Sequence, residues 1–227
     1  MSELKLSKRL STTASYVRSG AFVADIGTDH AYLPIYLVSK GIASLALASD
    51  INEGPILKAR ENISKYGLSD KIYTEIANGL DEIEKYKPTD IVICGMGGEL
   101  IAQILDASAY IKNQSIRLVL QPMTSVYELR EYLSDGFSTI DENIVFEDGK
   151  LYQIICVEYD GKKHDYTCAE LELGKLNIES KSDEYIALLN QTINKKEKRL
   201  NGLKIGGYDT SKVEAEILEL ERLKNDI

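Results

Sequence analysis

Short apolar runs alternate with segments of helical periodicity along most of this chain, and no other feature constrains its fold as strongly. The apolar runs are typical of buried strands, which are predicted at 22–26, 45–49, 72–76, 91–94 and 118–120. Apolar residues spaced three and four apart predict helices at 33–39, 56–66, 99–110 and 126–134. Strands that alternate with helices build a mainly parallel sheet covered on both faces. The sequence therefore predicts an α/β fold.

The pattern changes after residue 137, where two strands follow each other directly. They are predicted at 137–146 and 151–159, and the turn between them contains Asp148-Gly149, which is a signal for a tight hairpin. The sheet is thus expected to hold seven strands and to finish with an antiparallel hairpin. This ending is usual in class I methyltransferases, whereas a nicotinamide-binding fold has no such requirement.

The last third of the chain has a different pattern. Residues 161–181 are polar and irregular, so we expect a linker between a first domain at 1–160 and a helical hairpin at 182–227. The first helix of the hairpin has a coiled-coil seam with one basic interruption, formed by Ile186, Leu189, Ile193, Lys196, Leu200 and Leu203.

Gly206-Gly207 is expected to end this helix, and Ser211 with Glu214 forms a capping-box pattern that starts another. The apolar stripe of the second helix is formed by Val213, Ile217, Leu220 and Ile227. Because the loop is so short, the two helices are expected to be antiparallel.

Composition indicates a cytoplasmic protein that binds no metal and does not enter the membrane. Of the 227 residues 44% are apolar and 28% are charged, and no run approaches the ~20 apolar residues that span a bilayer. Residues 1–10 lack the apolar core of a secretory signal. Three cysteines at scattered positions, Cys94, Cys156 and Cys168, argue against a disulfide framework and against a zinc site.

The charge distribution is uneven. The net charge is −9, with 15 basic and 23 acidic residues in 1–160 but 12 and 13 in 161–227. This balance argues against a protein that coats nucleic acid without specificity. A local basic run is formed by Lys195, Lys196, Lys198, Arg199 and Lys204. It is typical of a solvated helix face, and it is also compatible with an RNA contact.

A strand, a turn and a helix are predicted over 23–34, with Gly27 at the end of the strand. Ligands of parallel sheets bind at this position, beside the following helix. A dinucleotide fingerprint requires two further glycines, but the chain has Asp29 and Tyr32 in their places. A carboxylate there would repel a pyrophosphate, whereas it tolerates the amino group and sulfonium of S-adenosylmethionine. The motif thus favours that cofactor over a dinucleotide.

Polar residues also follow the next two strands. Asp50 ends the second strand, where a carboxylate can accept hydrogen bonds from both ribose hydroxyls or can cap the next helix. Asn78-Gly79 ends the third, where a polar side chain can bind the adenine amino group or form a plain turn. Both alternatives stay open for each position.

A stretch rich in glycine, Gly95-Met96-Gly97-Gly98, follows the fourth strand. Methyltransferases that act on amino groups often hold the target nitrogen at this position, and the missing side chains leave room for a planar base. Gln121 ends the fifth strand at the same edge of the sheet, where it can bind a base or form part of a turn.

Five segments resemble the bacterial tRNA adenine-N1 methyltransferases that modify position 22. They are L-S-K-R-L at 6–10, D-I-G-T-D-H-A-Y-L-P at 25–34, A-S-D-I-N-E-G-P at 48–55, D-I-V-I-C-G-M-G-G at 90–98 and L-Q-P-M-T at 120–124. The resemblance covers nearly the whole chain, including the helical hairpin. It implies a Rossmann-like class I methyltransferase fold, S-adenosylmethionine as cofactor and tRNA as partner, with no obligate protein partner evident.

The resemblance also implies roles for single residues. Asp29 would be catalytic and would face the target base. The cofactor pocket would be lined by Asp25, Gly27, Thr28, Asp29, His30, Asp50, Ile51, Asn78, Gly79 and Gly95. Where the family has Gly-Asp-Gly-Leu, this chain has Ala77-Asn78-Gly79-Leu80, and an Asn oxygen can also accept from the adenine amino group.

Contacts to tRNA are expected from two sets of residues. Near the target base these are Met96, Gly97, Gly98 and Gln121, and for the phosphates they are Lys5, Lys8, Arg9, Lys195, Lys196, Lys198, Arg199 and Lys204. Two other functions remain open. A methyltransferase for a small molecule or a protein would fit the low basicity, and a non-catalytic S-adenosylmethionine-binding module would use the hairpin for assembly.

Overall fold

The computed structural model describes residues 4–226 and divides into two compact units, one that ends at His164 and one that begins at Asp165. The first unit contains a seven-stranded sheet in the order β3-β2-β1-β4-β5-β7-β6. Its strands are β1 (Ala21–Ile26), β2 (Ala43–Asp50), β3 (Ile72–Ile76), β4 (Asp90–Gly97), β5 (Arg117–Thr124), β6 (Asp135–Glu147) and β7 (Lys150–Lys163). The sequence-based prediction of seven strands is confirmed.

The pairing of the strands is mixed, as expected. The strands β1 to β5 pair in parallel, and β7 lies antiparallel between β5 and β6. The chain moves from β1 to β2 on one side and from β3 across to β4 on the other, so the strand order reverses beside β1. Ligands of open α/β sheets bind at such a reversal, beyond the carboxyl ends of the strands.

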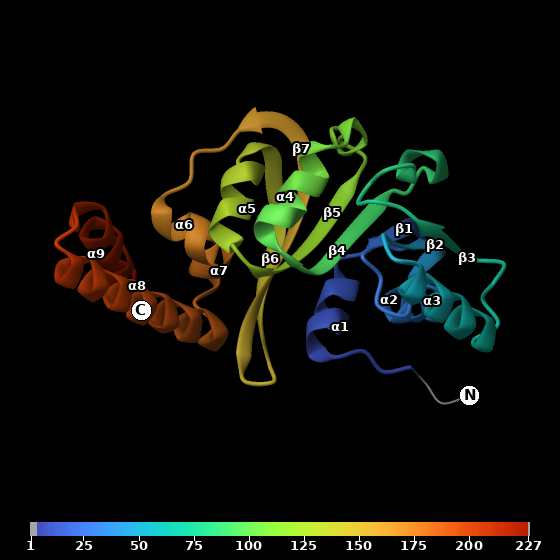
Figure 1. The fold of residues 1–227 in the computed structure, drawn as a ribbon, viewed down its shortest axis with the longest axis horizontal. Coiled ribbons are helices and arrows are strands. Elements are labelled where there is room, and N and C mark those ends of the chain that lie inside the picture. The colour runs from blue at the N-terminus through green and yellow to red at the C-terminus, as the bar shows by residue number, and fades with distance from the viewer. Residues whose placement is uncertain (1–3, 227) are drawn as a thin grey trace. The chain divides into compact units, whose positions relative to one another are not determined.

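Helices cover both faces of this sheet (Figure 1). One apolar cluster includes side chains of α1 (Lys8–Ser15), α2 (Tyr32–Ser39) and α3 (Glu53–Lys65), and the other includes side chains of α4 (Gly98–Asp106) and α5 (Val126–Leu133). Two short 3-10 helices, η1 (Ile83–Tyr86) and η2 (Ala109–Ile111), lie beside the second cluster. Helices α2 to α5 were predicted from the sequence, but α1 was not, because it is rich in Ser and Thr and buries only Thr13 and Ala14.

The second unit is entirely helical. It consists of α6 (Cys168–Leu173), α7 (Lys175–Ser180), α8 (Asp183–Gly206) and α9 (Ser211–Asn225). The expected linker is therefore wrong over most of its length, because α6 and α7 occupy it. A capping box formed by Thr167 and Glu170 starts α6, and helices of six residues are too short to show a periodic pattern.

The long helices α8 and α9 form the expected antiparallel hairpin (Figure 1). Gly207 ends α8 in the left-handed conformation, with φ of 69°. The expected capping box at Ser211 is not formed, because Ser211 is already helical and its hydroxyl donates to Asp209 Oδ1 at 2.6 Å. Val213, Ile217 and Leu220 are buried, while Ile227 lies outside the described residues.

Candidate functional site

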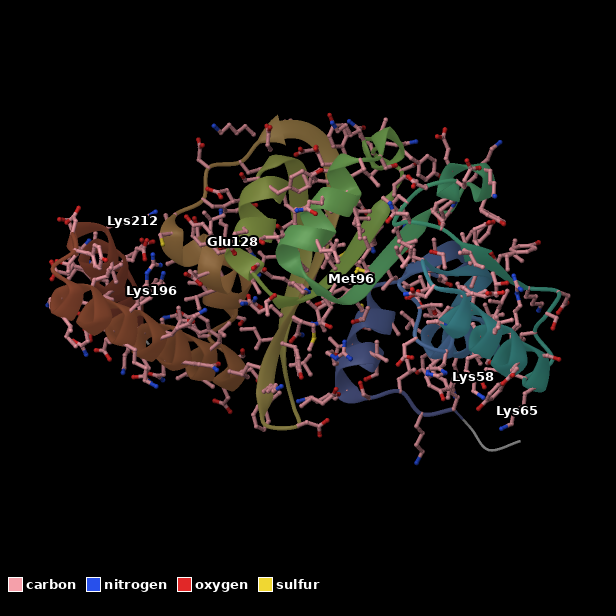
Figure 2. All side chains as sticks on the ribbon, viewed as in Figure 1. Lys58, Lys65, Met96, Glu128, Lys196 and Lys212 are labelled. Atoms are coloured by element: carbon pink, nitrogen blue, oxygen red, sulfur yellow. The ribbon has the colours of Figure 1, made fainter. Side chains whose placement is uncertain are left out.

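The turn after β1 is built around Gly27. This residue has a φ of 71°, in the left-handed region that favours glycine. A Cβ atom at Gly27 would also lie 2.1 Å from Cε of Met96, so the turn packs tightly against the end of β4. Figure 2 labels Met96 in the middle of the first unit, where β4 ends. Two motifs that lie about seventy residues apart in sequence are thereby brought together.

Asp25 is the buried acid of this turn. Its side chain accepts a hydrogen bond of 2.6 Å from the Thr28 hydroxyl. Burial raises the pKa of Asp25 to about 6; the Thr28 hydrogen bond opposes this shift, and the charges of Asp29 and Asp50 add to it. Three predicted cofactor residues thus place carboxylates close together, and such a site favours a ligand with positive charge.

The segment from Asp29 to Ala31 is strained. His30 and Ala31 both have positive φ, 59° and 58°, which residues with a Cβ rarely adopt. The His30 carbonyl accepts a hydrogen bond of 3.0 Å from Nδ2 of Asn62 on α3, which holds the segment in place. Asn62 was not predicted from the sequence, because one polar residue on a helix carries no signal of a long-range partner.

The side chains of this segment lie at the mouth of the site. The Asp29 side chain is 86% exposed, and its Oδ1 lies 2.9 Å from Nε2 of His30. The His30 ring stacks on Tyr32 at a centroid distance of 5.7 Å. Nδ1 of His30 and Oγ of Ser49 are buried without a hydrogen-bond partner among the described residues. Buried polar atoms of this kind are usually satisfied by a ligand or water.

Asp50 and Ile51 stand at the end of β2. Asp50 Oδ1 accepts a hydrogen bond of 2.7 Å from the backbone N–H of Asn52, while α3 begins one residue later without a side-chain cap. The alternative that Asp50 caps this helix therefore does not hold. Ile51 is 59% exposed, so an apolar side chain adjoins the carboxylate at the surface. The backbone N–H of Ala77 donates to the carbonyl of Asp50 at 3.1 Å, which joins the ends of β2 and β3.

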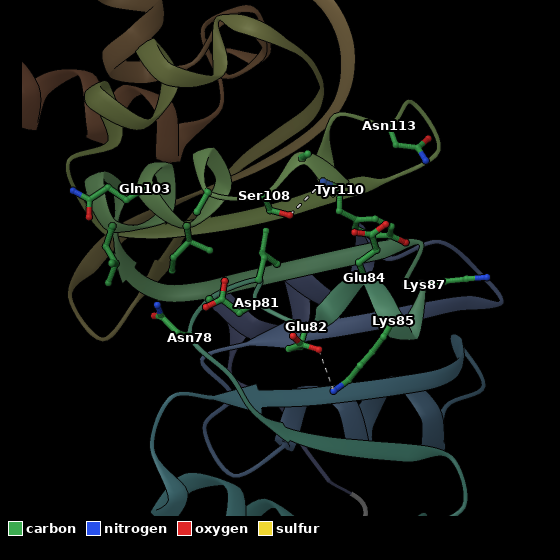
Figure 3. Close-up of a pocket in the computed structure, with 16 residues that line it drawn as sticks. Asn78, Asp81, Glu82, Glu84, Lys85, Lys87, Gln103, Ser108, Tyr110 and Asn113 are labelled. Carbon is green, nitrogen blue, oxygen red and sulfur yellow. Dashed lines mark hydrogen bonds and ion pairs between the residues drawn. The ribbon is translucent and has the colours of Figure 1, made fainter.

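Asn78 and Gly79 contribute to a pocket of about 990 Å³. The pocket lies between the segment that follows β3 and the helices α4 and η2, with polar side chains such as Asp81, Gln103 and Tyr110 around it (Figure 3). Asp25, Gly27 and Asp50 do not line it. We place the centre of the site at the strand ends instead, because the carboxylates and the glycine turn lie there and the pocket adjoins them only through Asn78 and Gly79.

The glycines after β4 have different environments. A Cβ atom at Gly95 would meet nothing within 4 Å, so open space adjoins this residue. At Gly97 it would lie 3.2 Å from Oγ1 of Thr124. At Gly98, which is buried, it would lie 2.1 Å from the carbonyl oxygen of Ser125. The expectation that Gly98 leaves room for a base is thus corrected, because Gly98 allows α4 to approach the start of α5 closely.

Gln121 and Arg9 bind each other instead of facing outward. Gln121 is fully buried, its Oε1 accepts a hydrogen bond from Nη1 of Arg9, and its Nε2 donates to the carbonyl of Pro122 at 2.7 Å. The backbone N–H of Arg9 donates to Glu147 at 2.8 Å, and its guanidinium lies 5.5 Å from the centre of the Tyr152 ring. Both predicted RNA contacts are therefore corrected: this pair joins α1 to β5 and to the β6–β7 hairpin. Lys5 and Lys8 are exposed.

The basic run of α8 is partly neutralised within the second unit. Lys196 is buried, and its Nζ lies 2.6 Å from Glu172 of α6 and 2.8 Å from Glu216 of α9. Burial lowers the pKa of Lys196, but its two carboxylate partners outweigh burial and the pKa is raised. Lys196, the basic residue that interrupts the apolar seam of α8, thus forms an internal ion pair. Its assignment as an RNA contact is corrected.

The other members of the run lie on the surface. Lys204 pairs with Glu214 at 3.2 Å and is about half exposed, and Lys195, Lys198 and Arg199 are exposed. In the described part of the chain, no three His, Cys, Asp or Glu side chains are grouped to hold a metal ion. No helix among the residues that the structure describes is long and apolar enough to cross a membrane.

The sequence is similar to those of known proteins. Residues 6–155 match the family model described as a methyltransferase domain. The tRNA (adenine(22)-N(1))-methyltransferase of Bacillus subtilis is 44% identical over 177 residues, which are 78% of this chain and 74% of that protein.

Solved structures are similar over almost the full length. The B. subtilis m1A22 tRNA methyltransferase TrmK has a TM-score of 0.83 and 35% identity, with 98% of this chain and 97% of that chain covered. M. capricolum TrmK, solved with the natural cofactor product S-adenosylhomocysteine, has a TM-score of 0.83 and 30% identity, with 96% of both chains covered.

Proposed function

The chain belongs to the methyltransferase-domain family and, within it, to the tRNA (adenine-22, N1) methyltransferases, and from this membership we propose that it methylates N1 of adenine 22 in the D-loop region of tRNA. The observation that carries the proposal is the acid-lined site at the carboxyl ends of β1, β2 and β4. This site belongs to a chain of which 78% matches the B. subtilis enzyme. The protein is proposed to act in the cytoplasm.

The residues at the strand ends fit S-adenosylmethionine. Gly27 leaves no room for a side chain, and the buried Nδ1 of His30 and Oγ of Ser49 still need partners. The carboxylates of Asp25 and Asp50 suit the amino group and the ribose hydroxyls of the cofactor, and Asn78 suits its adenine. When bound, S-adenosylmethionine supplies a methyl group on a positively charged sulfur.

The chemistry requires positioning more than acid or base catalysis. Adenine N1 has an in-plane lone pair and no proton, so no residue has to remove a proton before the attack. Holding N1 in line with the methyl group at near-attack distance supplies most of the acceleration. The open space beside Gly95 suits a planar base that lies against the backbone of β4.

Asp29 is proposed to contact the target base. Its carboxylate is exposed at the mouth of the site and is oriented by His30 at 2.9 Å. A carboxylate in this place can accept a hydrogen bond from the exocyclic amino group of adenine. It also stabilises the positive charge that N1-methyladenine acquires in the reaction.

The hairpin of α8 and α9 is proposed to hold tRNA through exposed cations. Those that the structure leaves at the surface are Lys195, Lys198, Arg199 and the half-exposed Lys204, together with Lys5 and Lys8 of the first unit. Phosphate contacts of this kind supply affinity without reading sequence.

Nucleoside mass spectrometry tests the proposal directly. Unmodified tRNA that contains adenine 22 is incubated with the protein and S-adenosylmethionine, and N1-methyladenosine is expected. The matched control is the same tRNA with guanine at position 22, in which the product should be absent. A methyl label that appears in protein or in a small molecule, and not in tRNA, would contradict the proposal and support the first alternative function. Failure to bind S-adenosylmethionine in calorimetry would exclude methyl transfer altogether.

A further inference from the structure

Two large apolar side chains are exposed at the turn of the α8–α9 hairpin. Ile205 is 89% exposed and Tyr208 is 70% exposed, which are the highest values for large apolar residues in the described part of the chain. Single exposed apolar residues are common on proteins. Here two of them flank the same turn, Gly206-Gly207, and the ring of Tyr208 lies against Gly206.

The turn gives Tyr208 a fixed backbone. The N–H of Tyr208 donates to the carbonyl of Leu203 at 3.0 Å and the N–H of Gly207 donates to that of Lys204 at 3.3 Å, which together form a Schellman motif. Asp209 Oδ1 accepts the backbone N–H of Ser211 at 3.0 Å, which closes the turn from the other side. A ring on such a turn loses little conformational freedom when it binds a partner.

Gly206 makes room for the ring. Its φ is not positive, unlike that of Gly207, so a residue with a side chain can adopt its backbone conformation. A Cβ atom at Gly206 would, however, lie 2.5 Å from Cε2 of Tyr208. Because α8 extends through Gly206, alanine would be the better helix former there. In the described structure the ring of Tyr208 therefore lies against Gly206, in the space that a side chain at this position would occupy.

The chain on either side of the turn is rich in basic residues. Residues 195–212 contain six Lys or Arg and two Asp or Glu. Lys196 is buried in ion pairs, but Lys195, Lys198, Arg199 and Lys212 are exposed on the two helices. Figure 2 labels Lys196 on α8 and Lys212 at the start of α9. Proteins that bind unpaired nucleotides combine a basic surface for the phosphates with an aromatic ring for the base.

We propose that Tyr208 is a stacking platform for an unpaired nucleobase of the RNA substrate, with the exposed cations of α8 bound to the flanking phosphates. The inference rests on the proposed function, since it takes tRNA as the partner. Charge complementarity favours RNA over a protein partner, for which an exposed apolar pair would not need a basic surface. The turn would thus make a contact with RNA that is separate from the methyl-transfer site.

Binding of full-length variants to an unmodified tRNA transcript tests the proposal. Stacking of one base contributes ~1–3 kcal/mol by alanine substitution, so Tyr208→Ala should weaken tRNA affinity about 5- to 150-fold. Tyr208→Phe and Tyr208→Trp should bind within about twofold of wild type, because they keep the ring. The slope of log affinity against log salt should be the same in all three variants, since no phosphate contact is lost.

Leu218→Ala is the matched control, because Leu218 is 51% exposed on α9 of the same unit but lies away from the turn. It should leave affinity unchanged, and all variants should bind S-adenosylmethionine like wild type. Equal tRNA binding by Tyr208→Ala and wild type would overturn the inference, as would equal losses in Tyr208→Ala and Tyr208→Phe. If wild type neither binds nor methylates tRNA, the proposed function itself fails, and the two failures are thereby distinguishable.

Discussion

At the scale of single residues, the site is governed by carboxylates that lie close together. Asp25 is the most buried of them and has a pKa of about 6, mainly because burial disfavours its charge. An acid whose pKa is raised on folding destabilises the protein when it is ionised. The free energy of unfolding of the cofactor-free protein should therefore fall as pH rises from about 4 to about 6 and then stay level.

Cofactor binding should show the opposite dependence on pH. The positive charge of S-adenosylmethionine favours ionised Asp25, so the affinity for the cofactor should rise between pH 5 and pH 7. The rise should be roughly tenfold for each unit by which cofactor binding lowers the pKa of Asp25. Asp25→Asn should bind more weakly at pH 7.5 and should lose this dependence. Titration calorimetry at several pH values measures both effects, with the exposed carboxylate of Asp81 changed to Asn as the control. An unaltered pH dependence in Asp25→Asn would assign the titration to another group.

Asp29 should affect chemistry more than binding. Its carboxylate is 86% exposed at the mouth of the site, where the target base is proposed to lie. Asp29→Ala should lower kcat by about tenfold or more while the dissociation constant of S-adenosylmethionine changes less than threefold, because a charge-assisted hydrogen bond contributes about 1.5–3 kcal/mol. Steady-state methylation and calorimetry give the two quantities. Equal losses in both would show that Asp29 is a cofactor ligand instead.

Residues at strand ends were easier to predict than the partners of charged side chains. Gly27 and Asp50 were placed correctly at the ends of β1 and β2, because strand boundaries follow from apolar runs and parallel strands present their carboxyl ends together. Arg9 was not, since its partners Gln121 and Glu147 lie more than one hundred residues away. Lys196 was mistaken for a surface cation because its partners Glu172 and Glu216 belong to other helices, whose packing the local basic run does not reveal.

At the scale of elements, the sequence predicts periodic segments well and short helices poorly. The β6–β7 hairpin and the α8–α9 hairpin follow from turn signals and apolar spacing. In contrast, α1 is rich in Ser and Thr, and α6 and α7 have only six residues each. Their positions depend on contacts made after folding. One such contact is the ion pair of Lys196, which connects α8 to both α6 and α9.

This internal ion pair should stabilise the helical unit. Lys196→Met would remove the cation that lies between Glu172 and Glu216. Loss of one partner of a buried pair costs about 3–5 kcal/mol. Hydrogen exchange of α8 amides should therefore be faster, while S-adenosylmethionine binding in the first unit should not change. Lys195→Met, at the exposed neighbouring position, is the control and should alter stability by less than about 0.5 kcal/mol. Adding Glu172→Gln and Glu216→Gln to Lys196→Met should restore most of the protection; failure to do so would indicate lost packing rather than lost charge balance.

At the scale of the whole molecule, the observed boundary between the units gives each unit a different charge count from the boundary that the sequence predicted. Because the first unit ends at His164, it includes Lys162 and Lys163 and holds 17 basic and 23 acidic residues, while the second unit holds 10 and 13. The second unit is therefore acidic overall, and its basic character is confined to 195–212. An acidic protein can hold tRNA only through such local surfaces, because phosphate contacts need cations.

The exposed cations of α8 should thus control tRNA affinity and its dependence on salt. Reversal of Lys195, Lys198 and Arg199 to Glu, with Lys196 kept to preserve the internal ion pair, should weaken tRNA binding by at least tenfold. It should also reduce the salt slope by about 0.7 to 0.9 for each phosphate contact that is lost. Reversal of Arg222 and Lys224, which are exposed near the end of α9, is the control for net charge; because it holds two reversals against three, the losses are compared for each reversed residue. Deletion of the hairpin should begin at residue 165, because a cut at 182 would leave α6 and α7 without the helices they pack on. If both sets of reversals weaken binding equally for each reversed charge, the loss comes from general electrostatic repulsion and not from a defined RNA-binding surface. The hairpin would then be left with an assembly role.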